Sequence, residues 1–147
     1  MSRLLIKATL ANKIEVVSNL IESSYDLNER NELGQTALII ATIADYHEIT
    51  RLLLEAGCNP NFVDEFGQSA LMYAVVNKNI EIVELLLKYG AETNLKNLAG
   101  RTAFDMAREN GFSLRYGAII TSVEFSCWQS ESKILKILKK HEKCQKF

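Results

Sequence analysis

The pattern of hydrophobic and polar positions along the chain repeats at a fixed interval. The segment LGQTAL at 33–38 returns as FGQSAL at 66–71 and as AGRTAF at 99–104, so the period is 33. When residues 31–63 are aligned without gaps on residues 64–96, 13 of 33 positions are identical. Residue usage alone would give about 2 matches. The chain is therefore built from repeated units.

Each unit is predicted to contain a turn followed by two short helices. Apolar residues at helical spacing, such as Ile49, Leu52 and Leu53, predict the second helix of a unit. Glycines at the start of the units predict turns with positive φ, and the Thr or Ser two residues later is a good helix N-cap. These residues are Gly34, Gly67 and Gly100, followed by Thr36, Ser69 and Thr102. Gly57 and Gly90 predict left-handed ends of the second helices.

The N-terminal residues fit the same register but lack the leading turn. We therefore expect one domain over residues 1–147 with four units, at about 1–30, 31–63, 64–96 and 97–143. The two outer units are atypical, as expected where a terminal unit presents one face to water.

The repeated motifs resemble those of the ankyrin repeat family. They are G-x-[TS]-A-L, the paired short helices, the ending [LI]-L-L-x-x-G-[AC] and an Asn four residues beyond that Gly. The resemblance covers nearly the whole chain. It implies an all-α solenoid of stacked helix-turn-helix units with turn tips and atypical N- and C-terminal capping repeats. The chain departs from the family's T-P-L-H, which reads TALI, SALM and TAFD here, so the family's Pro and His are replaced.

The fourth unit is predicted to carry an insertion at about 112–130. Four apolar residues beyond it reproduce the spacing of Ile82, Val83, Leu85 and Leu86, namely Ile134, Leu135, Ile137 and Leu138. The alternative is a second helix at 113–120 without a gap, followed by an added C-terminal helix. Lysines on the last helix predict the outer face of a polar cap: Lys133, Lys136, Lys139, Lys140 and Lys143.

The insertion is rich in aromatic residues. It holds Phe112, Tyr116, Phe125 and Trp128, and the alternation over 123–127 is a weak strand signal. Long loops within compact repeats are often functional, and Trp is a favoured anchor in interfaces. Trp128 is therefore a candidate partner-binding residue. The alternative is that these aromatics fold back and cover the last repeat.

Composition and charge narrow the class of protein. With 147 residues, 48% hydrophobic and 24% charged, the chain suits one globular domain. No apolar run is long enough to span a membrane, the N-terminus does not read as a secretory signal, and three cysteines make no disulfide scaffold. A cytoplasmic location is expected. Residues 31–99 hold nine acids and four bases, a net charge of -5, which disfavours nucleic acid.

The residues that carry catalytic or metal chemistry are not arranged for it. His47 and His141 lie in different units, and no Cys or His pair has metal-ligand spacing. Cys58 occupies a small-residue position, where Ala91 stands in the next unit, and is expected to be buried. We predict that the chain is not an enzyme, with no catalytic residue, metal or cofactor.

The side chains left free by stacking define the candidate binding surface. The resemblance implies that partners dock on the turn tips and on the first helices along a concave groove. On the tips the candidates are Glu32, Leu33, Gln35, Glu65, Phe66, Gln68, Leu98 and Arg101. On the first helices they are Ile43, Val76 and Asn77. Leu33, Phe66 and Leu98 form an apolar row, which serves either a partner or the packing of neighbouring turns.

The function predicted from these features is that of a non-catalytic protein–protein interaction module. Its partner is another protein, and the acidic tips favour a partner surface with basic patches. We expect no nucleic acid, no membrane and a monomer. The alternative is a dedicated inhibitor that covers an enzyme's active site with the insertion at 112–130. A small enzyme or metal protein, or a structural piece of a larger protein, is disfavoured by the missing motifs, by Met1 and by the lysine-rich end.

Overall fold

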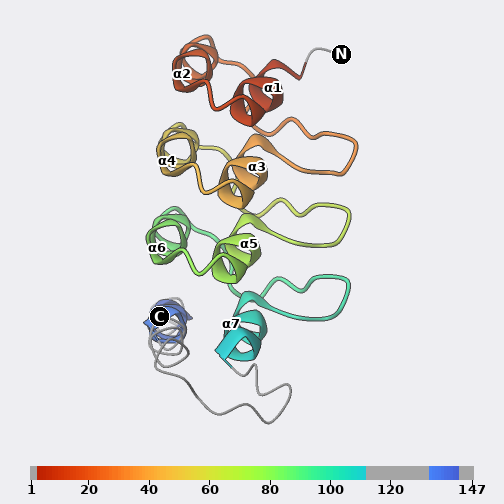
Figure 1. Ribbon diagram of the computed structural model, residues 1–147, viewed down its shortest axis with the longest axis vertical. Coiled ribbons are helices and arrows are strands. Elements are labelled where there is room, and N and C mark those ends of the chain that lie inside the picture. The colour runs from red at the N-terminus through yellow and green to blue at the C-terminus, as the bar shows by residue number, and fades with distance from the viewer. Residues whose placement is uncertain (1–2, 112–132, 143–147) are drawn as a thin grey trace.

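The computed structural model describes residues 3–111 and 133–142, which form one stack of paired helices (Figure 1). The labelled helices are α1 (Leu4–Leu10), α2 (Ile14–Glu22), α3 (Ala37–Ile43), α4 (His47–Glu55), α5 (Ala70–Val76), α6 (Ile80–Lys88) and α7 (Ala103–Gly111). First helices form one column, second helices form another, and the turns project on the side away from the second helices. The expected all-α stack of helix-turn-helix units is confirmed. The insertion at 112–130, including Trp128, lies outside the described residues.

A further helix over residues 133–142 stands in the column of second helices, below α6 (Figure 1). Ile134 and Leu138 on this helix are buried, at 1% and 0% exposure, while Leu135 and Ile137 pack against the core. The helix thus occupies the place that the spacing of its apolar residues predicts. The alternative helix at 113–120 falls outside the part of the chain that the structure describes.

Each turn is organised by the side chain of its first residue. The Oδ1 atom of Asn31 accepts hydrogen bonds from the backbone N–H groups of Leu33 and Gln35, both at 2.9 Å. The Oδ1 atoms of Asp64 and Asn97 do the same in the next two turns. Asn and Asp favour such turns because their short side chains can replace a backbone acceptor. Sequence reasoning missed these three residues, although their recurrence at the repeat period is visible in the sequence.

Neighbouring turns are joined by backbone hydrogen bonds. The carbonyl of Leu33 accepts from the N–H of Glu65 at 2.9 Å, and that of Phe66 accepts from the N–H of Leu98 at 3.0 Å. The turns approach so closely that a Cβ on Gly67 would come within 3.0 Å of the Cα of Asn97. Gly67 also has a φ of 73°, a conformation that favours glycine. These bonds align the turn tips along the stack.

The first helices begin at the predicted N-caps. Thr36 accepts a hydrogen bond from the N–H of Ile39, and Ser69 accepts one from the N–H of Met72. In the last unit Thr102 and Asp105 bond each other's backbone N–H groups, which is a reciprocal capping box. The hydrogen bonds from Thr102 lower the pKa of the Asp105 carboxyl. The N-terminal boundaries of these helices are therefore fixed by the residues that the sequence singles out.

The asparagines that follow the second helices link one unit to the next. The Oδ1 atom of Asn28 accepts from the N–H of Asn59 at 2.9 Å, and that of Asn61 accepts from the N–H of Glu92 at 2.8 Å. In addition, the Asn61 amide donates to the carbonyl of Gly90 at 3.2 Å. The recurrent Asn therefore ties the loops of successive units together.

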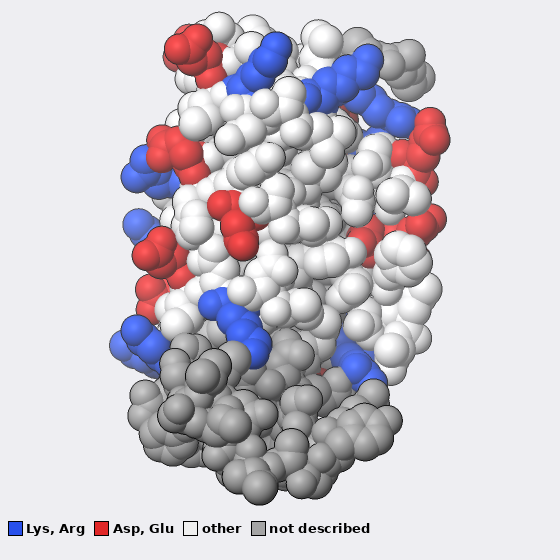
Figure 2. Space-filling view, viewed as in Figure 1, with Lys and Arg blue, Asp and Glu red and all other residues white. Residues whose placement is uncertain are grey.

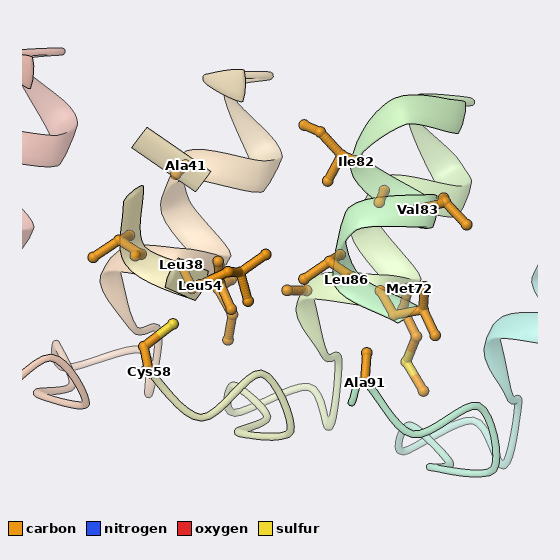
Figure 3. Close-up of a cluster of buried hydrophobic side chains, with 14 of the residues drawn as sticks. Leu38, Ala41, Leu54, Cys58, Met72, Ile82, Val83, Leu86 and Ala91 are labelled. Carbon is orange, nitrogen blue, oxygen red and sulfur yellow. The ribbon is translucent and has the colours of Figure 1, made fainter. Parts of the chain in front are cut away.

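The core runs without interruption between the two columns of helices. Leu53 and Leu86, which occupy equivalent positions in successive units, are both 0% exposed. Burial of one leucine side chain contributes about 1.5–3 kcal/mol. Figure 3 shows Cys58 pointing toward the Leu38 and Leu54 side chains, with Ala91 in the corresponding place of the next unit. Since Cys58 is 6% exposed, its predicted role as a small buried side chain is confirmed.

We expect Asp64→Ala to lower the free energy of unfolding by about 2–3 kcal/mol. The substitution removes the acceptor of the Phe66 and Gln68 N–H groups and of the Tyr73 hydroxyl, which donates to Asp64 Oδ2. Asp64→Asn is the matched control, because asparagine is the acceptor at the other two turns, and it should cost about 1 kcal/mol or less. Urea denaturation measures both. Equal losses in the two variants would show that the turn acceptor is not what stabilises this unit.

Candidate functional site

The turn tips expose a row of large apolar side chains. Leu33, Phe66 and Leu98 are 45%, 54% and 79% exposed, and we call them the apolar tip row. The backbone hydrogen bonds between the turns bring these residues to successive levels of the stack. Of the two interpretations offered by the sequence, this degree of exposure favours a surface left free for a partner over side chains packed between turns.

A second row of exposed apolar residues lies at the C-terminal ends of the first helices. It consists of Leu10, Ile43 and Val76, which recur at the repeat period and are 61%, 41% and 45% exposed. We call it the apolar helix row. The sequence identified Ile43 and Val76 as candidates but missed Leu10, because the first unit lacks the turn that marks the register. Both rows run along the stack on its first helices and their turns.

The polar candidates on the tips also hold the turns together. The side-chain oxygen of Gln35 accepts from the Asn31 amide at 3.0 Å, and Glu32 pairs with Arg3 at 3.5 Å. Gln68 is half-buried, and its Oε1 atom has no hydrogen-bond partner among the described residues. Arg101 is exposed beside the last turn. Of these residues, Glu32 presents the most open side chain, at 89% exposure.

Asn77 joins two units rather than standing apart from them. Its amide donates to the carbonyls of Thr42 and Ile43 at 3.2 Å, at the end of α3 in the preceding unit. The same amide lies 3.4 Å from Asp45 Oδ1. The residue is exposed, so it is both accessible and committed to the stack. This role was not anticipated from the sequence.

Charge is distributed unevenly over the face seen in Figure 2. Acidic side chains follow both edges, over the turn tips and over the second helices, where basic side chains are mixed with them. The middle of this face is mostly uncharged, apart from one acidic patch. Glu32 and Glu65 are the exposed acids beside the apolar tip row. The candidate surface is therefore apolar with an acidic margin.

The described residues do not assemble a chemical centre. Across 3–111 and 133–142, no group of His, Cys, Asp and Glu comes together as a metal site would require. His47 contacts Asn79 and Glu81 of the next unit, at 3.3 Å and 3.4 Å, rather than a cysteine. Burial raises the pKa of the Cys58 thiol to about 12, which keeps it protonated and unreactive. In the described part of the chain, no helix combines the length and apolar character needed to cross a bilayer.

Comparison with protein families agrees with this architecture. A family model described as ankyrin repeats (3 copies) matches residues 5–97. The match covers the first three units. The helix pair formed by α7 and residues 133–142 continues the same stack beyond the matched range. A comparison with curated proteins gives no match.

The exposure of the tip row makes a clear prediction for stability. Phe66→Ala should lower the free energy of unfolding by about 1 kcal/mol or less, because the ring is 54% exposed. Leu53→Ala, at 0% exposure, should cost about 2–5 kcal/mol and serves as the buried control. Chemical denaturation checks both variants. A comparable loss for Phe66→Ala would mean that the ring packs neighbouring turns.

The burial of Cys58 predicts slow reaction with thiol reagents. In a chain with Cys127→Ser and Cys144→Ser, the native protein at pH 8 should react about a thousandfold more slowly than an ordinary thiol, because its pKa is about 12 instead of 9.0. The same chain unfolded in urea should react at the ordinary rate. A colorimetric thiol assay measures both rates. Rapid labelling of the native form would contradict the burial.

Proposed function

The chain belongs to the ankyrin repeat family, and from that premise we propose that it binds a partner protein through the apolar tip row and the apolar helix row. Ankyrin repeats are in general non-catalytic protein–protein interaction modules. The observation that carries the proposal is the pair of exposed apolar rows that recur with the repeat. Isolated exposed apolar residues are common on protein surfaces, but aligned rows of them characterise binding sites.

The chemistry of this surface indicates what its partner presents. Apolar residues of the partner would cover Phe66 and Leu33, and basic residues would lie opposite Glu32 and Glu65. Aromatic anchors supply much of the affinity at protein interfaces, while charges at the rim select partners and speed association. We therefore propose a partner with an apolar strip bordered by lysine or arginine.

The rigidity of the stack supports tight binding through a small number of anchors. The backbone hydrogen bonds between Leu33 and Glu65, and between Phe66 and Leu98, hold the tips in position before any partner arrives. A surface that is already ordered loses little conformational entropy on docking. Anchors on flexible loops would lose more of the interaction energy to ordering.

The free thiol of Cys58 suits a reducing compartment. We propose that the protein acts in the cytoplasm, where such a thiol persists.

The combined substitution of Phe66→Ala and Glu65→Lys tests the proposed surface. It should weaken partner binding about 100-fold or more, because it removes the aromatic anchor and reverses an adjacent charge. The partner is first captured from the native cell and identified by mass spectrometry. Its affinity for the wild-type chain and for the variant is then measured by titration.

Two controls accompany this experiment. Glu84→Lys makes the same charge change on the exposed side of α6, away from both apolar rows, and should leave affinity within about twofold. Circular dichroism should show equal helicity in all variants. If the tip variant binds as tightly as the wild type, the two rows are not the binding surface.

A further inference from the structure

The N-terminal end of the stack exposes apolar residues that are covered everywhere else. Val16, Ile49 and Ile82 occupy equivalent positions, each one repeat beyond the last, on the second helices of three successive units. Ile49 and Ile82 are 0% exposed, whereas Val16 is 42% exposed. The inner units each have a unit stacked on their N-terminal side, and the first unit has none among the described residues. The first unit therefore carries an interior residue at its open end.

The first helix of this unit shows the same feature. Leu4 stands where the following units have Ala37 and Ala70, which are 0% exposed, and it is itself 47% exposed. The alanines allow two first helices to approach closely, whereas a leucine projects beyond them. A terminal unit normally carries polar residues on its outer face. Leu4 and Val16 instead give this face the character of a contact surface.

The opposite end of the stack is polar. The helix over residues 133–142 exposes Lys133, Lys136, Lys139 and Lys140, while its apolar residues face the core. The two ends thus differ in chemistry. One is finished with lysines against water, and the other displays aliphatic side chains with a lysine, Lys7, on the same helix as Leu4.

We propose that a second copy of this chain docks on the N-terminal end face, defined here as Leu4, Lys7, Val16 and Asn19 of α1 and α2. The two copies meet end to end across a two-fold axis, so that each buries the aliphatic residues of the other. Such a contact is closed, because both N-terminal faces are used up in one dimer.

Charge selects this arrangement over the other ways of stacking copies. Head-to-tail stacking would bring Lys7 toward the lysines of the helix at 133–142, and like charges oppose it. Stacking α1 on the α1 of a second copy would place the two Lys7 side chains together. A two-fold axis parallel to the helices instead lays α1 over the α2 of the second copy. Lys7 then lies within reach of Glu22, an exposed acid at the end of that helix.

The size of the face sets the strength of the contact. It is formed by two helices of 7 and 9 residues, which is small for a permanent interface. We therefore expect a reversible dimer with a dissociation constant of order 10–100 µM. Glu22 and Lys7 would give it a moderate dependence on salt, because rim charges are screened by ions.

Sedimentation equilibrium of the full chain over a concentration series tests the proposal. The wild type should pass from monomer to dimer and form no larger species. Val16→Glu should raise the dissociation constant about 100-fold, because a two-fold contact contains the substitution twice. Val76→Glu, at a position of similar exposure in the apolar helix row, is the matched control and should dimerise as the wild type does.

A charge exchange tests the relative orientation of the copies. Lys7→Glu alone and Glu22→Lys alone should each weaken the dimer, and the two together in one chain should restore it to within about threefold of the wild type. Glu22 is the last residue of α2, where a lysine suits the helix dipole, so its substitution does not threaten the fold. Circular dichroism confirms helicity in each variant.

Several results would overturn the proposal. They are a wild type that stays monomeric at millimolar concentration, a Val16→Glu chain that still dimerises, or a dimer lost on Val76→Glu instead. Binding to the N-terminal end face by another protein, with the chain itself monomeric, would identify a different occupant and overturn it too. The variant Phe66→Ala with Glu65→Lys should dimerise normally, so failure of this contact and failure of the proposed partner surface are distinguishable.

Discussion

A pair of helices only 7 and 9 residues long cannot enclose its own apolar side chains, and this limit governs the whole molecule. Each unit depends on the next one along for the burial of residues such as Leu53 and Leu86, so the fold grows in one direction as a stack. The contacts that matter are between neighbours: α1 with α3, α3 with α5 and α5 with α7. Everything not needed for stacking is left on the surface, where it is available for recognition.

Most of this architecture could be predicted from the sequence because it repeats. Helix starts at Thr36 and Ser69, helix ends at Gly57 and Gly90, and the burial of Cys58 all follow from local chemistry read in register. The candidate surface was predictable only in part. Exposure of Phe66 followed from its place in a turn, but the hydrogen bonds from Asn77 reach back to α3 in the preceding unit. No pattern within one unit reveals such a bond.

The residues that sequence reasoning missed share a physical cause. Asn31, Asp64 and Asn97 act through backbone N–H groups, which are the same for every residue type, so their role does not register in a search for apolar periodicity. Leu10 was missed because a terminal unit lacks the turn that defines its register. The exposure of Val16 depends on a neighbour that is not there among the described residues, and this becomes visible only when equivalent positions are compared in three dimensions.

The backbone hydrogen bonds between adjacent turns have a consequence for how the protein could change over time. They fix the separation of successive tips through atoms that every amino acid possesses, so the scaffold does not depend on which side chains stand at Leu33 or Phe66. Side chains at the tips can therefore be exchanged while their spacing is preserved, much as interchangeable type sits on a printer's frame. A lineage carrying this fold could acquire a new specificity by a few substitutions at the tips without rebuilding the molecule that displays them.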